Sequence, residues 1–331
     1  MLPTDPEGLD RARSVLARLG ERMRFQVLGR DEVVDLVMVA LLADGHVLLE
    51  DYPGSGKTTL AKALGEALED GEGRDLPPFR RIQFTPDLLP SDITGVSVFE
   101  PGTGDFAFRP GPLFAHVVLA DEINRTSPKV QAAMLEAMAE KQVTVDNVTR
   151  PLDELFFVIA TQNPRDVAGT YPLPLPQLDR FLFKIRMDHI SREAELQVLA
   201  TRLARRAEPG GPPVTRAELL EARAQVETGV FVAEPVNHCL VDLARALRGH
   251  PQVVQGVSTR SLVLLVPALK AAAALRGRDF VSGEDVAWLA PLVFGHRMEL
   301  GPGAPSPAEV VRACLAEPME ALSRATLRGR A

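Results

Sequence analysis

The sequence predicts an α/β domain followed by a C-terminal region built almost entirely of helices. Three apolar runs read as buried strands, and each leads into residues that carry chemistry: 47–50, 117–120 and 156–161. From Ser191 onward the strand pattern nearly vanishes and helical periodicity takes over. This change of pattern predicts one domain over residues 1–189 and a second, helical domain over residues 190–331.

Two helices are predicted before the first strand. In the first helix, apolar residues recur at helical spacing: Leu9, Leu16, Leu19 and Met23. The stretch 27–30 breaks this pattern. Asp31 then suits the N-cap of a second helix that runs to Leu42.

Residues 47–60 read as a strand, a glycine-rich turn and the start of a helix. Gly54 and Gly56 let the backbone curl so that several N–H groups point at one anion, as in loops that hold phosphate at a helix N-terminus. Lys57 is placed to reach the β- and γ-phosphates of a nucleotide, and the Thr58 hydroxyl suits a Mg²⁺ ligand.

The match to a phosphate-binding loop is not strict. The pattern asks for glycine five residues before Gly56, where Asp51 stands. Asp can adopt turn conformations, so the loop is retained as an interpretation. For this stretch alone, the alternative is a chance Gly-Ser-Gly turn.

The next elements are shorter. Residues 79–84 read as a strand, and residues 85–92 have the chemistry of a helix start that Pro90 cuts short. Residues 96–99 and 106–108 alternate across a Pro-Gly-Thr-Gly-Asp turn, which predicts a β-hairpin.

Two adjacent carboxylates end the strand that begins at Val117. Asp121 suits the Mg²⁺ shell, and Glu122 suits a group that orients or deprotonates an attacking water. A strand ending in Asp-Glu is weak evidence alone, because many strands end at a polar loop. Its position about 65 residues after Lys57 agrees with the spacing of α/β nucleotide-binding folds.

Ser127 and Pro128 predict the start of a helix whose apolar face we assign to core packing. Residues 142–145 and 149–152 form a second hairpin candidate. The strand 156–161 delivers Asn163, which can position water beside a γ-phosphate. The alternative for Asn163 is an ordinary Asn-Pro turn residue.

Two arginines stand out in the later chain. Arg180 follows a proline-broken loop at a helix-to-strand junction and suits bidentate phosphate contact, although a surface salt bridge is the plainer reading. Arg260 lies in the first turn of a predicted helix over 259–275, where the helix dipole disfavours a cation. We therefore expect an anion or a function to hold it there.

Composition bounds the functional classes. Hydrophobic residues make up 46% of the 331 residues, charged residues 24%, and the net charge is −7, which fits a globular protein and argues against a general nucleic-acid sleeve. The two cysteines, Cys239 and Cys314, do not make a disulfide framework, and the six histidines show no metal-ligand spacing. With no signal peptide or long apolar run, we expect a cytoplasmic protein without direct membrane insertion.

Together these features resemble a MoxR family AAA+ ATPase over residues 25–300. The most specific runs are 81–95 (RIQFTPDLLPSDITG), 120–125 (ADEINR), 160–164 (ATQNP), 169–174 (GTYPLP) and 177–181 (QLDRF). The resemblance implies an AAA+ P-loop core, with a parallel sheet flanked by helices and two hairpin inserts, plus a C-terminal all-α lid. Asp51 looks like a variant that the family tolerates.

The resemblance also implies a role for each matched position. It implies ATP as substrate with Mg²⁺, and Arg180 as an arginine finger acting on a neighbouring subunit. Arg260 would be sensor 2 and Asn163 sensor 1. The cofactor-binding set would be Val27, Leu28 and Gly29 beside adenine, and Pro53, Gly54, Ser55, Gly56, Lys57, Thr58 and Thr59 (Walker A). Asp121 and Glu122 would be Walker B, with Thr58 and Asp121 as metal ligands.

The resemblance further implies a homo-oligomer, commonly a hexameric ring, that remodels or activates client proteins. A partner with a von Willebrand factor A domain is expected. Two alternatives stay open. One is a nucleic-acid-translocating motor, which the lack of Lys and Arg at the hairpin tips disfavours. The other is a nucleotide-gated scaffold with negligible turnover, motivated by Asp51.

Overall fold

The computed structural model describes residues 6–51, 54–70, 76–163, 169–201 and 211–328. A parallel five-stranded sheet forms its centre, with strand order β10-β1-β9-β6-β3. The bounds of these strands are Val47–Asp51 (β1), Phe79–Gln83 (β3), Val117–Asp121 (β6), Phe157–Gln162 (β9) and Phe183–Met187 (β10). Because all pairings are parallel, the carboxyl ends of the strands meet at one edge.

The sheet is buried on both faces, which explains its continuous apolar runs. Alternate residues of each strand belong to different cores. Leu49 and Leu119 pack with the layer that holds α1 (Pro6–Gln26), α2 (Asp31–Leu42) and α3 (Lys57–Glu66). Leu48 and Val118 pack with α5 (Pro128–Glu140) on the other face. The predicted α/β fold with helices on both faces of a parallel sheet is therefore confirmed.

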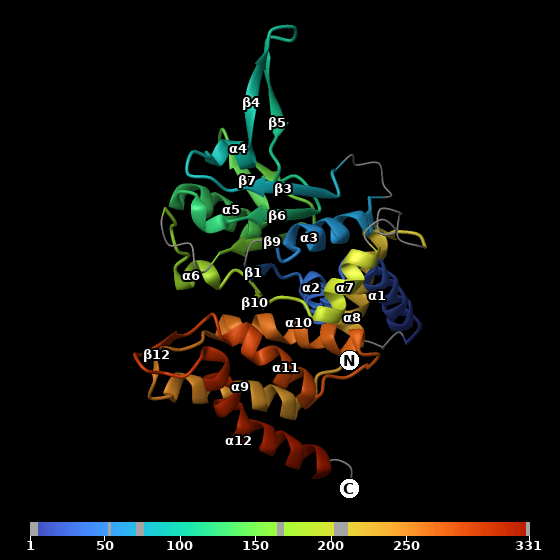
Figure 1. Ribbon diagram of the computed structural model, residues 1–331, viewed down its shortest axis with the longest axis vertical. Coiled ribbons are helices and arrows are strands. Elements are labelled where there is room, and N and C mark those ends of the chain that lie inside the picture. Colours follow the sequence, from blue (N-terminus) through green and yellow to red (C-terminus); the bar gives the residue numbers. More distant parts are fainter. Residues whose placement is uncertain (1–5, 52–53, 71–75, 164–168, 202–210, 329–331) are drawn as a thin grey trace.

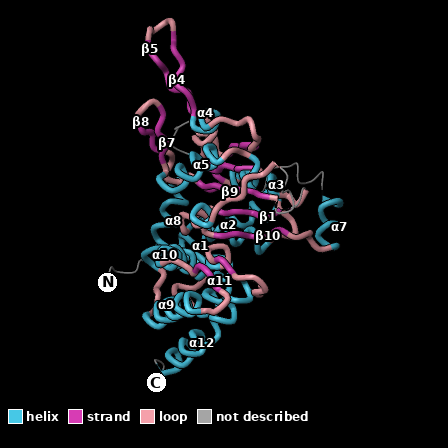
Figure 2. Tube along the Cα trace, turned by 90° about the vertical axis from the view of Figure 1, so that its left-hand side faces the viewer, coloured by secondary structure: helices cyan, strands magenta, loops and turns pink. Residues whose placement is uncertain are grey.

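Both predicted hairpins are present. The first is β4 (Gly95–Glu100) with β5 (Asp105–Pro110), and it projects from the body (Figure 1). The second is β7 (Gln142–Val145) with β8 (Val148–Pro151). Their roots meet where the Arg150 guanidinium lies 3.9 Å from the centroid of the Phe108 ring. The hairpins therefore share one base on the same side of the molecule (Figure 2).

One local prediction was wrong. Pro90 does not cut a helix short but begins α4 (Pro90–Thr94), with Leu89 as N-cap. Proline suits the first helical position, since the N–H that it lacks has no partner there. Asp92 accepts a hydrogen bond from the Leu89 backbone N–H at 2.8 Å and so closes the cap.

The second helix ends where it was predicted to end, with a small shift in capping. The N-cap of α2 is Arg30, and Asp31 is its first helical residue. The helix predicted from Ser127 is α5 (Pro128–Glu140), and its apolar side is buried as predicted. A 3₁₀ turn over Ile123–Arg125 precedes it.

The chain after β10 is mostly helical. Its helices are α7 (Arg192–Thr201), α8 (Arg216–Gly229), α9 (Glu234–Gly249), α10 (Thr259–Leu275), α11 (Gly283–Phe294) and α12 (Pro307–Arg328). The last four form an all-α lid beneath the sheet (Figure 1). Two short strand pairs interrupt this pattern, β2 (Leu68–Glu69) with β11 (Val214–Thr215) and β12 (Val253–Gln255) with β13 (Glu299–Leu300). Among the helices in the described ranges, none combines the length and apolar character that a membrane crossing requires.

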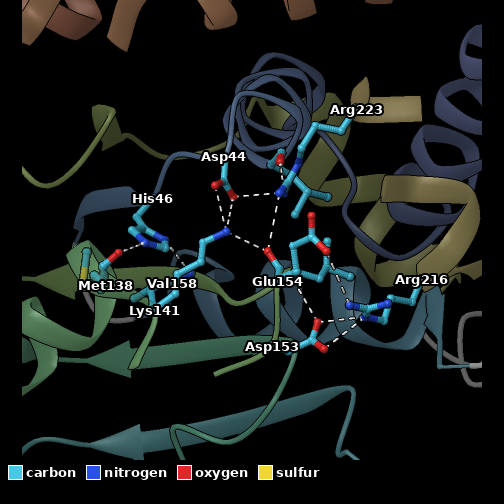
Figure 3. A network of polar contacts seen from close by, with 11 residues as sticks. Asp44, His46, Met138, Lys141, Asp153, Glu154, Val158, Arg216 and Arg223 are labelled. Carbon is cyan, nitrogen blue, oxygen red and sulfur yellow. Dashed lines mark hydrogen bonds and ion pairs between the residues drawn. The ribbon is translucent and has the colours of Figure 1, made fainter. Parts of the chain in front are cut away.

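Helix α8 is fixed to the amino edge of the sheet by a polar network (Figure 3). The Arg216 Nε lies 3.0 Å from each carboxylate oxygen of Asp153. Arg223 Nη1 donates to Asp44 at 2.7 Å, and Lys141 Nζ donates to the same carboxylate at 2.6 Å. The network joins α8 to the turns that precede β1, β7 and β9.

Candidate nucleotide site

The phosphate loop precedes α3 at the carboxyl edge of the sheet. Gly54 and Gly56 have φ values of 88° and 96°, a region that favours glycine. Gly56 is the N-cap of α3, and glycine has no side chain with which to cap the helix start. The N–H groups of the first turn and the helix dipole therefore suit an anion. Pro53 lies outside the described residues.

A buried polar atom at this loop also fits a ligand. The Ser55 Oγ is buried and has no hydrogen-bond partner among the described residues. The backbone carbonyl of Ser55 accepts a hydrogen bond from Arg30 Nη2 at 3.2 Å. Since Arg30 directly follows Gly29, this bond brings the segment 27–29 to the phosphate loop.

That segment is closely packed. Gly29 has a φ of 67°, and a Cβ there would lie 2.5 Å from the Cβ of Ala194 in α7. Val27 is buried. Glycine is thus required for the close approach of α7, and the segment lies between α7 and the loop. This placement agrees with the predicted role of Val27, Leu28 and Gly29 beside an adenine.

The first residue of α3 and the last residue of β6 form an ion pair. The Lys57 Nζ lies 3.2 Å from Asp121 Oδ1. The Asp121 side chain is only 3% exposed, so its charge needs partners. Two residues that the sequence places 64 positions apart, 57 and 121, therefore meet at one site, as the motif predicted.

Asp121 has two further partners. Thr161 Oγ1 donates to its Oδ1 at 2.8 Å, and Arg81 Nη2 lies 2.5 Å from its Oδ2. Burial alone would raise the pKa of Asp121, but the bonds from Thr161 and Arg81 and the charge of Lys57 outweigh it and lower that pKa. The carboxylate is thus held ionised, as a metal ligand must be.

Glu122 stands in a left-handed backbone conformation with a φ of 59°, which is uncommon for glutamate. Its N–H donates to Thr161 Oγ1 at 2.9 Å and so fixes this conformation. Its carboxylate accepts a hydrogen bond from Gln83 Nε2 at 2.9 Å and lies 3.3 Å from Arg125 Nε. The turn aims Asp121 and Glu122 in different directions, so the two carboxylates have different partners.

The donor set fits Mg²⁺. Across the described residues, histidine, cysteine and carboxylate side chains form no group of three or more suited to a metal ion. Mg²⁺ commonly uses one or two protein oxygens together with substrate phosphates. Asp121 and the Thr58 hydroxyl, one residue after Lys57 in α3, supply such oxygens. Thr59 is exposed in the same helical turn.

Asn163 lies directly after β9, which is placed between β1 and β6 in the sheet. Thr161 and Gln162 pair with Leu49 and Glu50 of β1. Asn163 therefore lies level with the end of β1, between the phosphate-loop strand and the Asp121 strand. The sensor 1 role of Asn163 stays a prediction.

The two late arginines have different partners. Arg180 Nη1 donates to the carbonyl of Leu135 in α5 at 3.1 Å. Arg260, at the start of α10, has its Nε 3.9 Å from Asp179 Oδ2. Asp179 is thus an anion that faces Arg260, as the position of a cation in a first helical turn predicted. The finger and sensor roles of these arginines stay predictions.

Family models match both parts of the chain. The ATPase family associated with various cellular activities (AAA) matches residues 46–183, and an AAA lid domain matches residues 245–316. The chain is 36% identical to chaperone MoxR1 of Mycobacterium tuberculosis, an alignment that covers 90% of this chain and 79% of that protein. This chain belongs to the MoxR family of AAA+ ATPases.

Further relatives agree with this membership. The uncharacterized protein YeaC of Bacillus subtilis is 45% identical, over 88% of each chain. Protein MoxR of Paracoccus denitrificans is 32% identical, over 83% of this chain and 86% of that protein. The crystal structure of a candidate ATPase from Cytophaga hutchinsonii superposes with a TM-score of 0.83 at 33% identity, over 93% of this chain and 96% of that one.

For this MoxR family member, reasoning from the sequence missed Arg81, Gln83 and Thr161 as site residues. All three lie on strands beside β6, and Gln83 is in register with Asp121. Arg81 and Gln83 are two residues apart, which puts both on one side of β3. That spacing in a strand next to the Asp121 strand is the signal that could have found them.

The MoxR site can therefore bind and polarise a nucleotide. Backbone N–H groups and Lys57 supply positive charge on the phosphate side. Asp121 is ionised beside them, and Glu122 lies one residue further with a carboxylate that can accept a proton. This combination suits phosphoryl transfer to water, which depends on placement and charge.

Proposed function

We propose that this protein is an oligomeric ATPase that couples ATP hydrolysis to the remodelling, maturation or activation of partner proteins. Family membership supports nucleotide binding and a chaperone-like role. The observation that carries the proposal is the convergence of Lys57, Asp121 and Glu122 from α3, β6 and the turn after it. Each of the three is held by neighbouring strands in an orientation suited to one task.

In this mechanism, ATP lies with its phosphates at the N-terminus of α3. Lys57 binds the β- and γ-phosphate oxygens and stabilises the charge that grows during transfer. Glu122 orients a water molecule for attack on the γ-phosphorus and accepts its proton, and Asn163 holds that water in line. Mg²⁺, held by Asp121 and Thr58, supplies further charge neutralisation when bound.

Assembly completes the site. In the proposal, Arg180 reaches the γ-phosphate of a neighbouring subunit, and Arg260 contacts the γ-phosphate from the lid. Support for this comes from Arg180, whose hydrogen bond goes to α5 rather than to the phosphate loop. A homo-oligomeric ring, with six subunits as in many relatives of this class, would place one such arginine at each site.

The β4–β5 hairpin is our candidate for the client contact. Its strands carry exposed apolar side chains, which single out a protein contact: Val96, Val98, Phe99 and Phe106. Its tip, residues 100–105, contains no Lys or Arg. A contact to nucleic acid needs positive charge, so the surface favours a protein client over a nucleic-acid track. We place the protein in the cytoplasm with a von Willebrand factor A domain protein as adaptor.

The test compares two variants in native lysate with ATP and Mg²⁺. Glu122→Gln should bind ATP without hydrolysing it, while Lys57→Ala should not bind stably. We expect a client or adaptor to be retained by Glu122→Gln alone. Phosphate release by the wild type and its loss in both variants are measured in parallel.

Three results would redirect the proposal. Full hydrolysis by Lys57→Ala would refute it. Stimulation of turnover by DNA that fades with added salt would favour a nucleic-acid motor. ATP-dependent assembly without phosphate release would favour a nucleotide-gated scaffold.

A further inference from the structure

Residues 179–182, the segment that carries Arg180, are held by hydrogen bonds from the lid. Arg297, just after α11, donates from Nε to Asp179 Oδ1 at 2.7 Å. Its Nη2 also donates to the carbonyls of Asp179 and Phe181, at 3.2 and 2.6 Å. Its Nη1 donates to the carbonyl of Leu182 at 3.1 Å. One lid arginine therefore holds the residues on both sides of Arg180.

These hydrogen bonds of Arg297 are buried. Arg297 is 5% exposed, and its neighbour His296 lies with Nε2 3.0 Å from the same Phe181 carbonyl. Burial lowers the pKa of Arg297, and the carboxylate of Asp179 opposes that effect. Burying a guanidinium without such a partner would be very costly. Lid and segment are thus joined by contacts that are costly to break, unlike those of a surface ion pair.

Asp179 has a second lid arginine on its other oxygen. Arg260 Nε lies 3.9 Å from Oδ2, and the Arg260 side chain is 58% exposed. The carboxylate therefore has one buried cation that stays and one exposed cation that is free to turn. A γ-phosphate is a stronger anion than a carboxylate and would compete with Asp179 for Arg260.

We infer that Asp179 is a positioning residue that couples the lid to Arg180. Asp179 precedes β10 at the amino edge of the sheet, whereas the phosphate loop of the same subunit follows β1 at the carboxyl edge, so the nucleotide within reach of Arg260 is the one that Arg180 approaches in a neighbouring subunit. When Arg260 turns to that nucleotide, the charge balance at Asp179 changes. Any lid rotation then moves residues 179–182, and Arg180 with them, through Arg297. The inference rests on the proposed function, since it assumes that Arg260 contacts ATP and that Arg180 acts on a neighbouring site.

A purely structural role makes a different prediction. If the contacts between Arg297 and residues 179–182 only stabilised the fold, loss of the Asp179 charge would lower stability. The change in hydrogen exchange on nucleotide binding would then remain. Coupling requires that the segment respond to nucleotide and that the response depend on Asp179. The backbone N–H of Leu182, which donates to the carbonyl of His46 at 2.7 Å, provides a local reporter in hydrogen exchange.

The experiment uses the full chain with Asp179→Asn and, as matched control, Asp44→Asn. Asp44 also joins two cations, Lys141 and Arg223, in the turn before β1. Its φ is 54°, a conformation that asparagine adopts readily. Two quantities are measured: steady-state turnover with the Kd of a fluorescent ATP analogue, and hydrogen exchange of residues 179–183 with and without AMP-PNP and Mg²⁺.

We expect Asp179→Asn to lower kcat about tenfold, within the usual range of coupling between sites, with the Kd within about twofold of wild type. AMP-PNP should change exchange at 179–183 in the wild type and in Asp44→Asn, and leave it unchanged in Asp179→Asn. Wild-type kcat and exchange response in Asp179→Asn would overturn the inference, as would the same losses in Asp44→Asn.

Arg297→Lys is the second variant. Lysine keeps a cation near Asp179 but cannot hold the carbonyls of Phe181 and Leu182 together, so the exchange response should again be lost. A wild-type response would count against coupling. Failure of the proposed function looks different, because then the wild type releases no phosphate or Arg180→Ala retains full turnover, while the exchange comparison still measures the coupling.

Discussion

The two edges of the central sheet carry similar residues and use them differently. At the amino edge, Asp153 and Asp44 pair with arginine and lysine in a network whose groups satisfy one another (Figure 3). At the carboxyl edge, Lys57 and Arg81 share the single carboxylate of Asp121. There the backbone is also held in a left-handed turn at Glu122.

The difference comes from what covers each edge. Helix α8 lies against the amino edge, so its arginines neutralise the carboxylates permanently. The carboxyl edge leads into the phosphate loop and the free start of α3, where positive charge is concentrated for a ligand. Charged side chains at the amino edge therefore pair with one another and stabilise the fold. Charged side chains at the carboxyl edge are placed to interact with a ligand.

The largest effect is expected from a substitution at the carboxyl edge, which should lower turnover and leave the amino edge unchanged. Glu122→Gln removes the group that accepts a proton from water and should lower ATP turnover by about 10²–10⁴-fold. The amide keeps the shape and the hydrogen bond from Gln83 can be rearranged, so the free energy of unfolding should change by less than about 0.5 kcal/mol. Phosphate release and urea denaturation measure the two. A matching loss of stability would remove the contrast between the edges.

The converse change breaks the amino edge alone. Arg216→Ala leaves the buried Asp153 carboxylate without the cation whose Nε lies 3.0 Å from both of its oxygens, and should lower the free energy of unfolding by about 3–5 kcal/mol. Turnover per folded molecule should stay within about twofold of wild type, since no site residue is touched. Arg223→Ala, whose partner Asp44 is 45% exposed, is the milder control. A drop in kcat larger than the drop in folded fraction would contradict the division.

Acid should affect stability through two buried histidines that lie outside the site. Burial lowers the pKa of His46 to about 4 and that of His296 to about 3. The unfolded chain binds protons first as pH falls from about 6.5, so stability is full above that pH and is lost progressively towards pH 4. A difference of one in pKa corresponds to about 1.4 kcal/mol, so the loss should reach several kcal/mol.

Urea denaturation at pH 7.5, 6 and 5 checks this slope. His46→Gln keeps a donor towards the Met138 carbonyl and should flatten part of the slope, because glutamine does not titrate. An unchanged slope in this variant would assign the acid sensitivity to other groups.

The smallest effect is expected at Thr161, which contributes both to stability and to turnover and so sharpens the comparison. Its hydroxyl donates to Asp121 and accepts from the Glu122 N–H. Thr161→Val keeps the shape but loses both bonds, and should cost about 1–2 kcal/mol of stability together with a roughly tenfold drop in turnover. Thr161→Ser should restore most of both. Loss of only one of the two properties would contradict the double role of this hydroxyl.

Sequence reasoning located the phosphate loop and Asp121 because their chemistry is tied to short local patterns. It could not pair Gln83 with Glu122, since that contact depends on β3 lying beside β6, and strand order is not written in any local spacing. The Arg216–Asp153 pair, 63 residues apart, was invisible for the same reason. Pro90 was misread because the same residue that ends one helix can begin another.

The lid residue Arg297 is a further example. In the sequence it is one basic residue in a helical region, and its five acceptors come from a segment more than 110 positions earlier together with its own helix. Only the packing of α11 against the turn before β10 creates its role. Long-range contacts of this kind need the fold before they can be read.

The shared base of the two hairpins has a mechanical consequence. Six residues per strand give the β4–β5 hairpin a reach of about 20 Å from its root at Gly95 and Pro110. A rotation of about 10° at that point displaces the tip by about 3.5 Å, as elementary trigonometry gives for an arm of that length. An arm of this length converts a small rotation at its root into a displacement at its tip of about one residue's length in an extended chain.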